Sequence, residues 1–342
     1  MLPSPLPLVS GGFSLEERRE RVDVIVVTWN TGELTAEALR RLLDHDQGCD
    51  VRLLVRDNGS SDGTVQTLAR LVPEAEVEAG SENLGFAAGV NKMLERSNAP
   101  WVFLLNSDAW PEFGAIRRLI ETARRHPKAA AVAPRLEYPR GGLQHSTHPF
   151  PSLRVAAVSA FVPRRIGPRR GEAMMLEGFW KHDRPRRVDW AIGAALLIRR
   201  EALDDIGSLD DRFFMYVEDL EWSWRALLRG WEIQFEPSAI VRHVGNASGD
   251  KDLGARARAY LLNTNRFFRR EHGVGSLWAD RGLNVIGCSF RYLGARRRGD
   301  RSAASFWWAN IRAHFTRLSE VEERAASRRH AEPSRLPGER NR

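Results

Sequence analysis

The sequence predicts an α/β protein built on a mainly parallel sheet with helices on both faces. Short β-branched runs alternate with helical patterns over residues 22 to 134. Strands separated by helices of this length form parallel sheets through right-handed crossovers. The run Trp101 to Leu105 is apolar at every position, which indicates a strand buried on both faces.

Each strand is expected from an apolar run that ends in turn-forming residues, and each helix from an apolar stripe of helical period. The expected strands are 22–28, 51–56, a short one near Val77, 101–105, 130–134, one that follows Gly193 within 188–199, and then 231–235 and 239–244. The first expected helix follows the turn TWNTG, and the others cover 64–71, 87–96, 111–126 and a stretch starting at Glu218. The tail is expected to be helical over 257–270 and around the apolar run 283–293.

Charge is unevenly distributed along the 342 residues. Residues 251–342 carry 20 Lys and Arg against 9 Asp and Glu, and the first 250 residues carry 32 against 35. A basic tail on a near-neutral body indicates contact with an anionic membrane surface or with nucleic acid. No RNA- or DNA-binding module is recognisable, so we expect no nucleic-acid partner.

The cellular compartment is predicted from cysteine usage and hydropathy. Two cysteines, Cys49 and Cys288, argue against a secreted disulfide scaffold and fit a reducing cytoplasm. The N-terminus has no basic start and is broken by prolines, so it is a poor signal peptide. No run reaches the roughly 20 apolar residues that a transmembrane helix needs. Membrane contact is therefore expected to be peripheral, at the inner face of the cell membrane.

The absence of two sequence motifs argues against two classes of nucleotide-binding protein. The turn after the first strand lacks G-x-G-x-x-G, and the chain has no G-x-x-x-x-G-K-[ST], which disfavours dinucleotide-binding and P-loop proteins. Polar residues nevertheless follow successive strands at the edge where open α/β sheets bind ligands. A carboxylate there suits a Mg²⁺-type ion that is shared with substrate phosphates. Each such residue alone is more often a cap or turn former. The set is Thr28, Asn30, Asp57, Asn83 and Asp108.

Five motifs in this order resemble glycosyltransferase family 2 of the GT-A type, particularly its bacterial rhamnosyltransferase-like branch. They are VTWN (27–30), DNGSSDG (57–63), NLGFAAGVN (83–91), LNSDA (105–109) and FFMYVEDLEWSWR (213–225). The resemblance covers roughly residues 22–250. It implies a GT-A fold, a nucleoside diphosphate sugar donor and a divalent metal.

The resemblance also implies roles on the donor side. Thr28, Asn30 and Asp57 would line the nucleobase site, where Asp57 would accept the imide N–H of a uracil or thymine. The residues expected beside the nucleoside are Asn83, Gly85, Gly89 and Asn106. The glycines would let the backbone approach the donor; the alternative is that they only serve a turn and tight helix packing. Asn106 stands where the family's D-x-D motif has its first Asp.

Metal, catalytic and acceptor roles follow from the same resemblance. Asp108 would hold the metal, Mn²⁺ or Mg²⁺, and His243 would complete the site, unless that histidine is structural. Asp219 would be the catalytic base, with the alternative that it only pairs with a helix dipole. The acceptor side would include Glu218, Gly193 and Trp190, the last with core packing as its alternative.

The predicted organisation is a disordered lead (1–21), a GT-A domain (22–250), an amphipathic helical extension (251–319) and a disordered basic tail (320–342). Residues 135–187 form a basic insertion, either solvated or on the acceptor side. The extension would lie on the membrane, although its first helix has docking onto the catalytic domain as an alternative.

The predicted function is an inverting transfer of a sugar to a polyprenyl-linked or cell-wall glycan acceptor, with dTDP-rhamnose or a UDP-sugar as donor. The alternative is a catalytically silent nucleotide-sugar scaffold. The sequence leaves the oligomeric state open.

Overall fold

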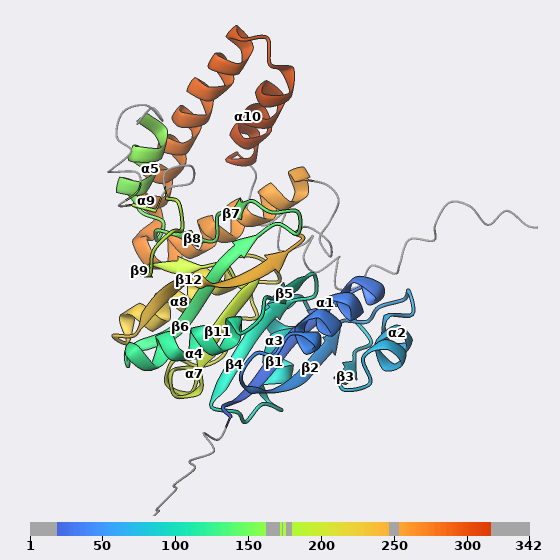
Figure 1. The fold of residues 1–342 in the computed structure, drawn as a ribbon. Coiled ribbons are helices and arrows are strands. Elements are labelled where there is room, and N and C mark those ends of the chain that lie inside the picture. The colour runs from blue at the N-terminus through green and yellow to red at the C-terminus, as the bar shows by residue number, and fades with distance from the viewer. Residues whose placement is uncertain (1–18, 162–171, 173, 176–179, 246–252, 316–342) are drawn as a thin grey trace, which may run out of the picture.

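The computed structural model describes residues 19–161, 172, 174, 175, 180–245 and 253–315. A twisted sheet lies at the centre with helices on both faces, and the C-terminal helices project from one end of it (Figure 1). Apart from residues 19–21, the predicted disordered lead lies outside the described residues, as does the predicted tail 320–342.

The main sheet has ten strands among the described residues. The strands of the structure are β1 (Arg21–Thr28), β2 (Asp50–Asp57), β3 (Glu76–Ala79), β4 (Trp101–Asn106), β5 (Ala109–Pro111), β6 (Ala129–Glu137), β7 (Leu143–Gln144), β8 (Thr147–His148), β9 (Arg186–Val188), β10 (Trp190–Ala191), β11 (Ala195–Arg199) and β12 (Glu232–His243). The order across the sheet is β3-β2-β1-β4-β11-β6-β12-β5, with β7 paired to β6 and β9 to β12. Strands β8 and β10 form a separate small sheet.

Parallel pairing dominates the sheet, as predicted. The three longest ladders, β1 with β2, β1 with β4 and β6 with β12, are all parallel. Strand β11 enters antiparallel between β4 and β6 and joins the two parallel halves.

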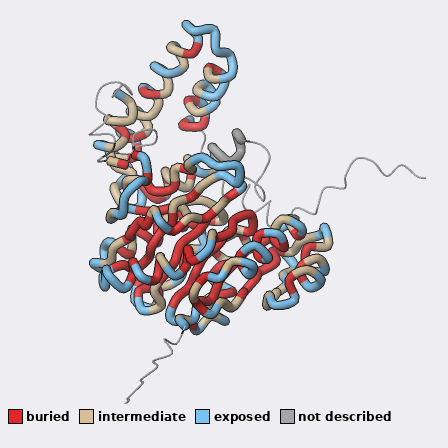
Figure 2. Tube along the Cα trace, viewed as in Figure 1, coloured by how far each residue is buried: buried red, intermediate tan, exposed pale blue. Residues whose placement is uncertain are grey.

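Helices pack on both faces because the strands are apolar on both sides. The helices are α1 (Gly32–Asp44), α2 (Thr64–Leu71), α3 (Phe86–Leu94), α4 (Ala115–Arg125), α5 (Leu153–Phe161), α7 (Arg200–Ile206), α8 (Glu218–Leu228), α9 (Leu253–Arg297) and α10 (Arg301–Ala313). In β4, Phe103 and Leu105 pack with α1 and α4, whereas Val102 and Leu104 pack with α3, α7 and α8. The buried residues therefore form a layer on each side of the sheet (Figure 2).

Two predictions were wrong in detail. Pro111, the expected start of the helix 111–126, lies in β5, and α4 begins only at Ala115. The expected strands 231–235 and 239–244 are a single strand, β12, whose register against β6 shifts between Glu236 and Ile240. Pro237 lies inside this shift, and proline cannot donate to a ladder, so it is tolerated at such a bulge. The sequence pattern breaks there although the strand continues.

The predicted insertion 135–187 is partly built into the fold. Its described residues include β7, β9 and the helix α5, and α5 packs against α9. Residues 162–171, 173 and 176–179 of this segment lie outside the described part. The span α9 consists of two helices that meet at a kink at Gly273, where φ is 81°, so the tail helices predicted separately over 257–270 and around 283–293 are confirmed. Helix α10 packs back on α9, and no helix among the described residues is long and apolar enough to cross a membrane.

We expect Phe103→Ala to destabilise the fold by about 3 to 5 kcal/mol, because it leaves a cavity at the centre of the sheet. Phe103 is fully buried, whereas Phe113 is 62% exposed. Urea unfolding of both variants measures the difference, with Phe113→Ala as the control. Equal unfolding midpoints for the two variants would contradict the assigned core.

Candidate active site

The polar ends of three strands lie side by side at one edge of the sheet. In the parallel ladders, Thr28 pairs with Asp57, and Val27 pairs with Asn106. Neighbouring strands are about 4.8 Å apart. Thr28, Asp57 and Asn106 therefore line a common edge, as the sequence predicted from strand ends alone.

The loops that follow β1 and β2 are tied to each other. The backbone N–H of Asn30 donates to Ser60 Oγ (2.8 Å), and Asn30 Oδ1 accepts from the N–H of Ser61 (2.9 Å). Thr28 Oγ1 lies 2.9 Å from Thr31 Oγ1, within a buried hydroxyl cluster. The side chains of Thr28 and Asn30 are thus held in place by protein contacts.

Asp57 presents a buried oxygen at the edge of the sheet. Its Oδ2 accepts from the N–H of Ser60 (3.0 Å). Its Oδ1 is buried and makes no hydrogen bond with the residues that the structure describes. A buried acceptor left without a donor costs free energy. The arrangement therefore suits a ligand that brings an N–H group to Oδ1.

Asn58 holds the turn before α3 against the end of β2. Its Nδ2 donates to the carbonyl of Gly85 (2.9 Å) and lies 3.4 Å from Asn83 Oδ1, which in turn accepts from the N–H of Gly85 (3.0 Å). The Asn83 side chain thus stabilises the turn through its hydrogen bond to Gly85. No sequence signal singled out Asn58, although it lies inside the DNGSSDG motif.

Both glycines of this region are explained by close packing. Gly85 has φ 86°, and a Cβ there would lie 2.3 Å from the carbonyl oxygen of Phe214. A Cβ on Gly89 would lie 2.9 Å from a methyl group of Val27. In addition, the N–H of Phe86 donates to the Phe214 carbonyl (2.8 Å). Gly85 therefore lets the turn before α3 dock on the segment that leads into α8.

Asp108 and His243 form a pair beside the end of β4. His243 Nε2 lies 3.3 Å from Asp108 Oδ1 and 3.3 Å from Asn106 Nδ2. His243 Nδ1 lies 2.8 Å from Gln144 Oε1, and Gln144 Nε2 donates to the His243 carbonyl (2.6 Å). Because Gln144 Oε1 accepts only, Nδ1 donates to it, which leaves Nε2 facing Asp108 and Asn106.

This donor set fits a divalent metal. An imidazole whose second nitrogen is held by a hydrogen bond is the usual form of a histidine ligand. No group of three or more His, Cys, Asp or Glu gathers around a common point among the described residues. A carboxylate and an imidazole suffice for an ion that also takes phosphate oxygens from a substrate. Gln144 lies in the basic insertion, where no sequence signal pointed to it.

Asp219 lies in the first turn of α8. Its Oδ2 accepts from the N–H of Gly193 (2.8 Å), and its Oδ1 accepts from the N–H of Leu220 (2.7 Å). Burial raises the pKa of the Asp219 carboxyl to about 6. Burial, and then the neighbouring charge of Asp219, raise the pKa of the Glu218 carboxyl well above its usual value. Adjacent carboxyl groups with raised pKa values are common at sites of acid–base chemistry.

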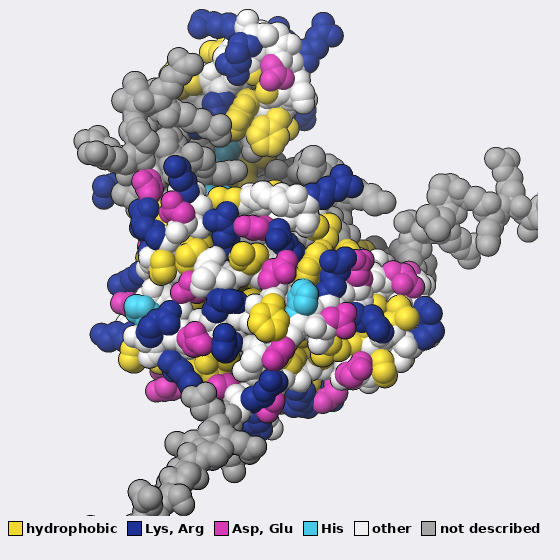
Figure 3. All heavy atoms as spheres, in the orientation of Figure 1, with side chains coloured by type: hydrophobic (Ala, Val, Ile, Leu, Met, Phe, Trp, Pro, Cys, Tyr) yellow, Lys and Arg dark blue, Asp and Glu magenta, His cyan; other side chains and the backbone are white. Residues whose placement is uncertain are grey.

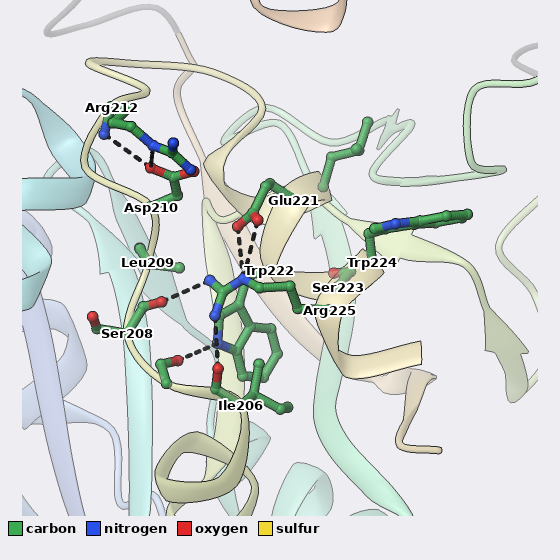
Figure 4. Close-up of polar contacts among 12 residues, drawn as sticks. Ile206, Ser208, Leu209, Asp210, Arg212, Glu221, Trp222, Ser223, Trp224 and Arg225 are labelled. Atoms are coloured by element: carbon green, nitrogen blue, oxygen red, sulfur yellow. Dashed lines mark hydrogen bonds and ion pairs between the residues drawn. The ribbon is translucent and has the colours of Figure 1, made fainter. Parts of the chain in front are cut away.

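Helix α8 is anchored by Arg225. Figure 4 shows its guanidinium between Glu221 and the loop after α7. It donates to Glu221 Oε2 (3.0 Å) and to the carbonyls of Ile206 and Ser208 (both 2.7 Å). Trp222 Nε1 donates to the carbonyl of Gly207 (2.9 Å). These bonds fix the helix that carries Glu218 and Asp219.

Hydrogen bonds from backbone N–H groups connect the end of β4 with the start of α8. The N–H of Asn106 donates to the carbonyl of Ala194 (2.9 Å), and the adjacent Gly193 donates to Asp219. On the other side, Phe86 bonds Phe214, a few residues before Asp219. The structure thus brings the loops of Asp57, Asp108 and Asp219 to one edge of the sheet.

A large groove begins at Trp190, beside the small sheet of β8 and β10. It has a volume of about 1280 Å³ and runs between α5, α9 and α10, with Trp190 and Tyr260 among its lining residues. Trp190 is buried, donates from Nε1 to the carbonyl of Pro149 (3.0 Å) and stacks on His148 (4.6 Å between ring centroids). Other apolar lining residues include Val155, Val158, Phe161, Leu261 and Phe290.

The C-terminal projection exposes aromatic side chains among arginines. Hydrophobic side chains lie next to Lys and Arg on this part of the surface (Figure 3). The large exposed apolar residues of α9 and α10 include Trp278, Ile286, Phe290, Leu293, Phe306 and Trp308.

Comparison with known proteins identifies the family. A model described as "Glycosyl transferase family 2" matches residues 23–207. N-acetylglucosaminyl-diphospho-decaprenol L-rhamnosyltransferase of Mycobacterium tuberculosis (strain ATCC 25618 / H37Rv) is 31% identical over 237 residues, which cover 65% of this chain and 76% of that protein. Poly-beta-1,6-N-acetyl-D-glucosamine synthase of Staphylococcus aureus (strain N315) is 24% identical over 226 residues, covering 65% of this chain and 49% of that protein.

Among solved structures, the fold is similar to mannosyltransferase PcManGT from Pyrobaculum calidifontis in complex with GDP-Man and Mn²⁺. The TM-score is 0.53 at 17% sequence identity, and the match covers 90% of this chain and 84% of that chain. This likeness confirms the predicted GT-A fold. Together with the family match over 23–207, it shows that the chain belongs to glycosyl transferase family 2 and is a glycosyltransferase.

Proposed function

We propose that this glycosyltransferase inverts the anomeric centre of its donor sugar, with Asp219 as the catalytic base. The observation that carries the proposal is the half-buried Asp219 carboxylate, whose pKa is raised to about 6 and whose segment is hydrogen-bonded to the edge that holds Asp57 and Asp108. A base with a pKa close to the working pH is both ionised and basic enough to take a proton.

The donor is proposed to be dTDP-rhamnose. The Mycobacterium tuberculosis relative is named as an L-rhamnosyltransferase, and the buried Oδ1 of Asp57 suits the imide N–H of thymine or uracil. Thr28 and Asn30 would border the base, while Asn83 would lie beside the nucleoside. Asn106 would bond the ribose. Gly85 and Gly89 would act through the close packing that shapes this part of the cleft.

Asp108 and His243 would hold a divalent metal, Mn²⁺ or Mg²⁺. When bound, such an ion neutralises negative charge on the departing diphosphate. Gln144 fixes the imidazole so that Nε2 faces Asp108. The imidazole ligand favours Mn²⁺ over Mg²⁺, because Mg²⁺ prefers oxygen ligands.

The transfer is a single displacement. The acceptor hydroxyl gives its proton to an Asp219 carboxylate oxygen, and the hydroxyl oxygen forms a bond to the anomeric carbon. The bond from that carbon to the diphosphate oxygen breaks, and its electron pair leaves with the nucleoside diphosphate. Burial raises the pKa of the Glu218 carboxyl well above its usual value, which favours the protonated form that can donate a hydrogen bond to the acceptor. Gly193 keeps Asp219 oriented.

The acceptor is proposed to be a polyprenyl diphosphate-linked sugar. The relative's name specifies N-acetylglucosaminyl-diphospho-decaprenol. The apolar groove that begins at Trp190 offers a surface for the prenyl chain next to the acceptor side. The exposed aromatics and arginines of α9 and α10 would lie on an anionic membrane surface. The enzyme would then work in the cytoplasm at the inner face of the cell membrane.

Two alternative functions compete with the proposed rhamnose transfer. A UDP-sugar donor is favoured by the same Asp57 geometry, since uracil carries the same imide N–H. A catalytically silent scaffold would bind a nucleoside diphosphate without turnover. A panel of dTDP- and UDP-sugars separates these outcomes.

We expect the protein with Mn²⁺ to transfer rhamnose from dTDP-rhamnose to polyprenyl-diphospho-N-acetylglucosamine, with an acidic limb of kcat/KM near pH 6. Activity falls below that pH because Asp219 becomes protonated.

Asp219→Asn should lower kcat by about 10²- to 10⁴-fold while donor binding persists. The measurements are radiolabelled product formation across pH and calorimetric binding of dTDP. Full activity of Asp219→Asn would refute the assigned base, and binding without turnover across the panel would support the scaffold.

The metal assignment predicts that chelation abolishes transfer and that Mn²⁺ restores it. Gln144→Ala leaves the imidazole in place but releases its orientation, so we expect about a 10- to 100-fold weaker apparent Mn²⁺ affinity. His243→Ala should have a larger effect. Asn310→Ala, in α10, serves as the control. Unchanged Mn²⁺ dependence in His243→Ala would remove that residue from the metal site.

Membrane contact predicts that Phe306→Ser/Trp308→Ser weakens binding to vesicles that contain anionic lipid by at least about tenfold, because each buried aromatic contributes about 1.5 to 3 kcal/mol. Vesicle flotation at low and high salt measures this binding, and high salt should weaken it further. Phe113→Ser, on the catalytic domain, is the control. Equal binding of all three proteins would contradict the assigned surface.

A further inference from the structure

The segment before Asp219 has an unfavourable backbone conformation. Tyr216 and Val217 have φ values of 70° and 79°, and neither is a glycine. Each left-handed residue costs about 1 to 2 kcal/mol, and the cost is greater for a β-branched side chain such as Val217. Such conformations persist only when surrounding contacts over-determine them.

One side chain of the C-terminal extension holds this segment. Asn263, on α9, donates from Nδ2 to the carbonyl of Met215 (2.9 Å) and to the carbonyl of Tyr216 (3.2 Å). A side-chain amide has two N–H groups, and both are used here. The carbonyl of Val217, the next in the chain, accepts from the N–H of Glu221 (2.8 Å) inside α8.

The part of α9 that carries Asn263 is itself fixed to α8. Arg270 Nη2 donates to Glu221 Oε1 (2.8 Å), and Trp224 Nε1 donates to Glu271 Oε2 (2.8 Å). Phe267 is fully buried and packs in one cluster with Val217 and Trp190. The position of Asn263 relative to the segment is therefore defined by several independent contacts.

We infer that Asn263 is a positioning residue, which holds the left-handed Tyr216–Val217 backbone so that Asp219 points at the acceptor hydroxyl. The inference rests on Asp219 as the proposed base. It gives the first part of α9 a role in the reaction in addition to any role at a membrane. A displacement of about 1 Å at a reacting group can cost about 100-fold in rate, so a small relaxation of the segment is enough to matter.

The test compares Asn263→Ala and Asn263→Asp with Ser289→Ala. Ser289 also lies in the extension, but its Oγ donates to the Val285 carbonyl within its own helix. We expect Asn263→Ala to lower kcat by about 10- to 100-fold with the donor KM within about twofold of the wild type. Asn263→Asp should be worse, since a carboxylate would face two carbonyl oxygens. Ser289→Ala should behave as wild type.

The pH profile separates positioning from general destabilisation. If Asp219 moves toward solvent in Asn263→Ala, the acidic limb shifts below pH 6, because burial is what raises this pKa. Circular dichroism at the assay temperature confirms that the variants are folded. Wild-type kcat in Asn263→Ala, or a loss with an unshifted limb, would overturn the inference. An active Asp219→Asn variant would reject Asp219 as the base. An inactive Asp219→Asn variant together with a normal Asn263→Ala variant would reject only the positioning role of Asn263.

Discussion

The parallel register of β1, β2 and β4 is the constraint on which the site depends. It places Thr28 opposite Asp57 and Val27 opposite Asn106, so polar residues far apart in sequence emerge at the same edge. The strands themselves are buried on both faces, and their side chains leave no room for a ligand. At this edge the covered part of the sheet ends, and polar groups can contact a ligand there.

Strand β11 extends this order across the middle of the sheet. It runs antiparallel to β4, so the residues that precede it, Gly193 and Ala194, lie at the edge where β4 ends. Ala194 bonds Asn106, and Gly193 bonds Asp219. The antiparallel direction of β11 thus links the end of β4 to the helix that carries the proposed base.

The start of helix α8 contains destabilising features that contacts elsewhere in the fold offset. Burial raises the pKa of both the Asp219 and the Glu218 carboxyl, that of Asp219 to about 6, so ionisation of Asp219 opposes folding. This group favours the folded state most below its unfolded pKa of about 3.9, and that contribution is lost as pH rises through about 6. The left-handed backbone at Tyr216 and Val217 adds to the cost. The contacts of Arg225, Arg270 and Asn263 offset it.

The sequence by itself determined the fold class, the polar strand ends at one edge of the sheet, and the family. Those features depend on local patterns, apolar runs and short motifs, which are readable without coordinates. Only the tertiary structure decided that Gln144 orients His243 and that Asn263 holds the backbone before Asp219. It also showed that β12 continues through Pro237. These features arise from pairings between residues about 50 to 100 positions apart, and an isolated Gln or Asn carries no local signal of its distant partner.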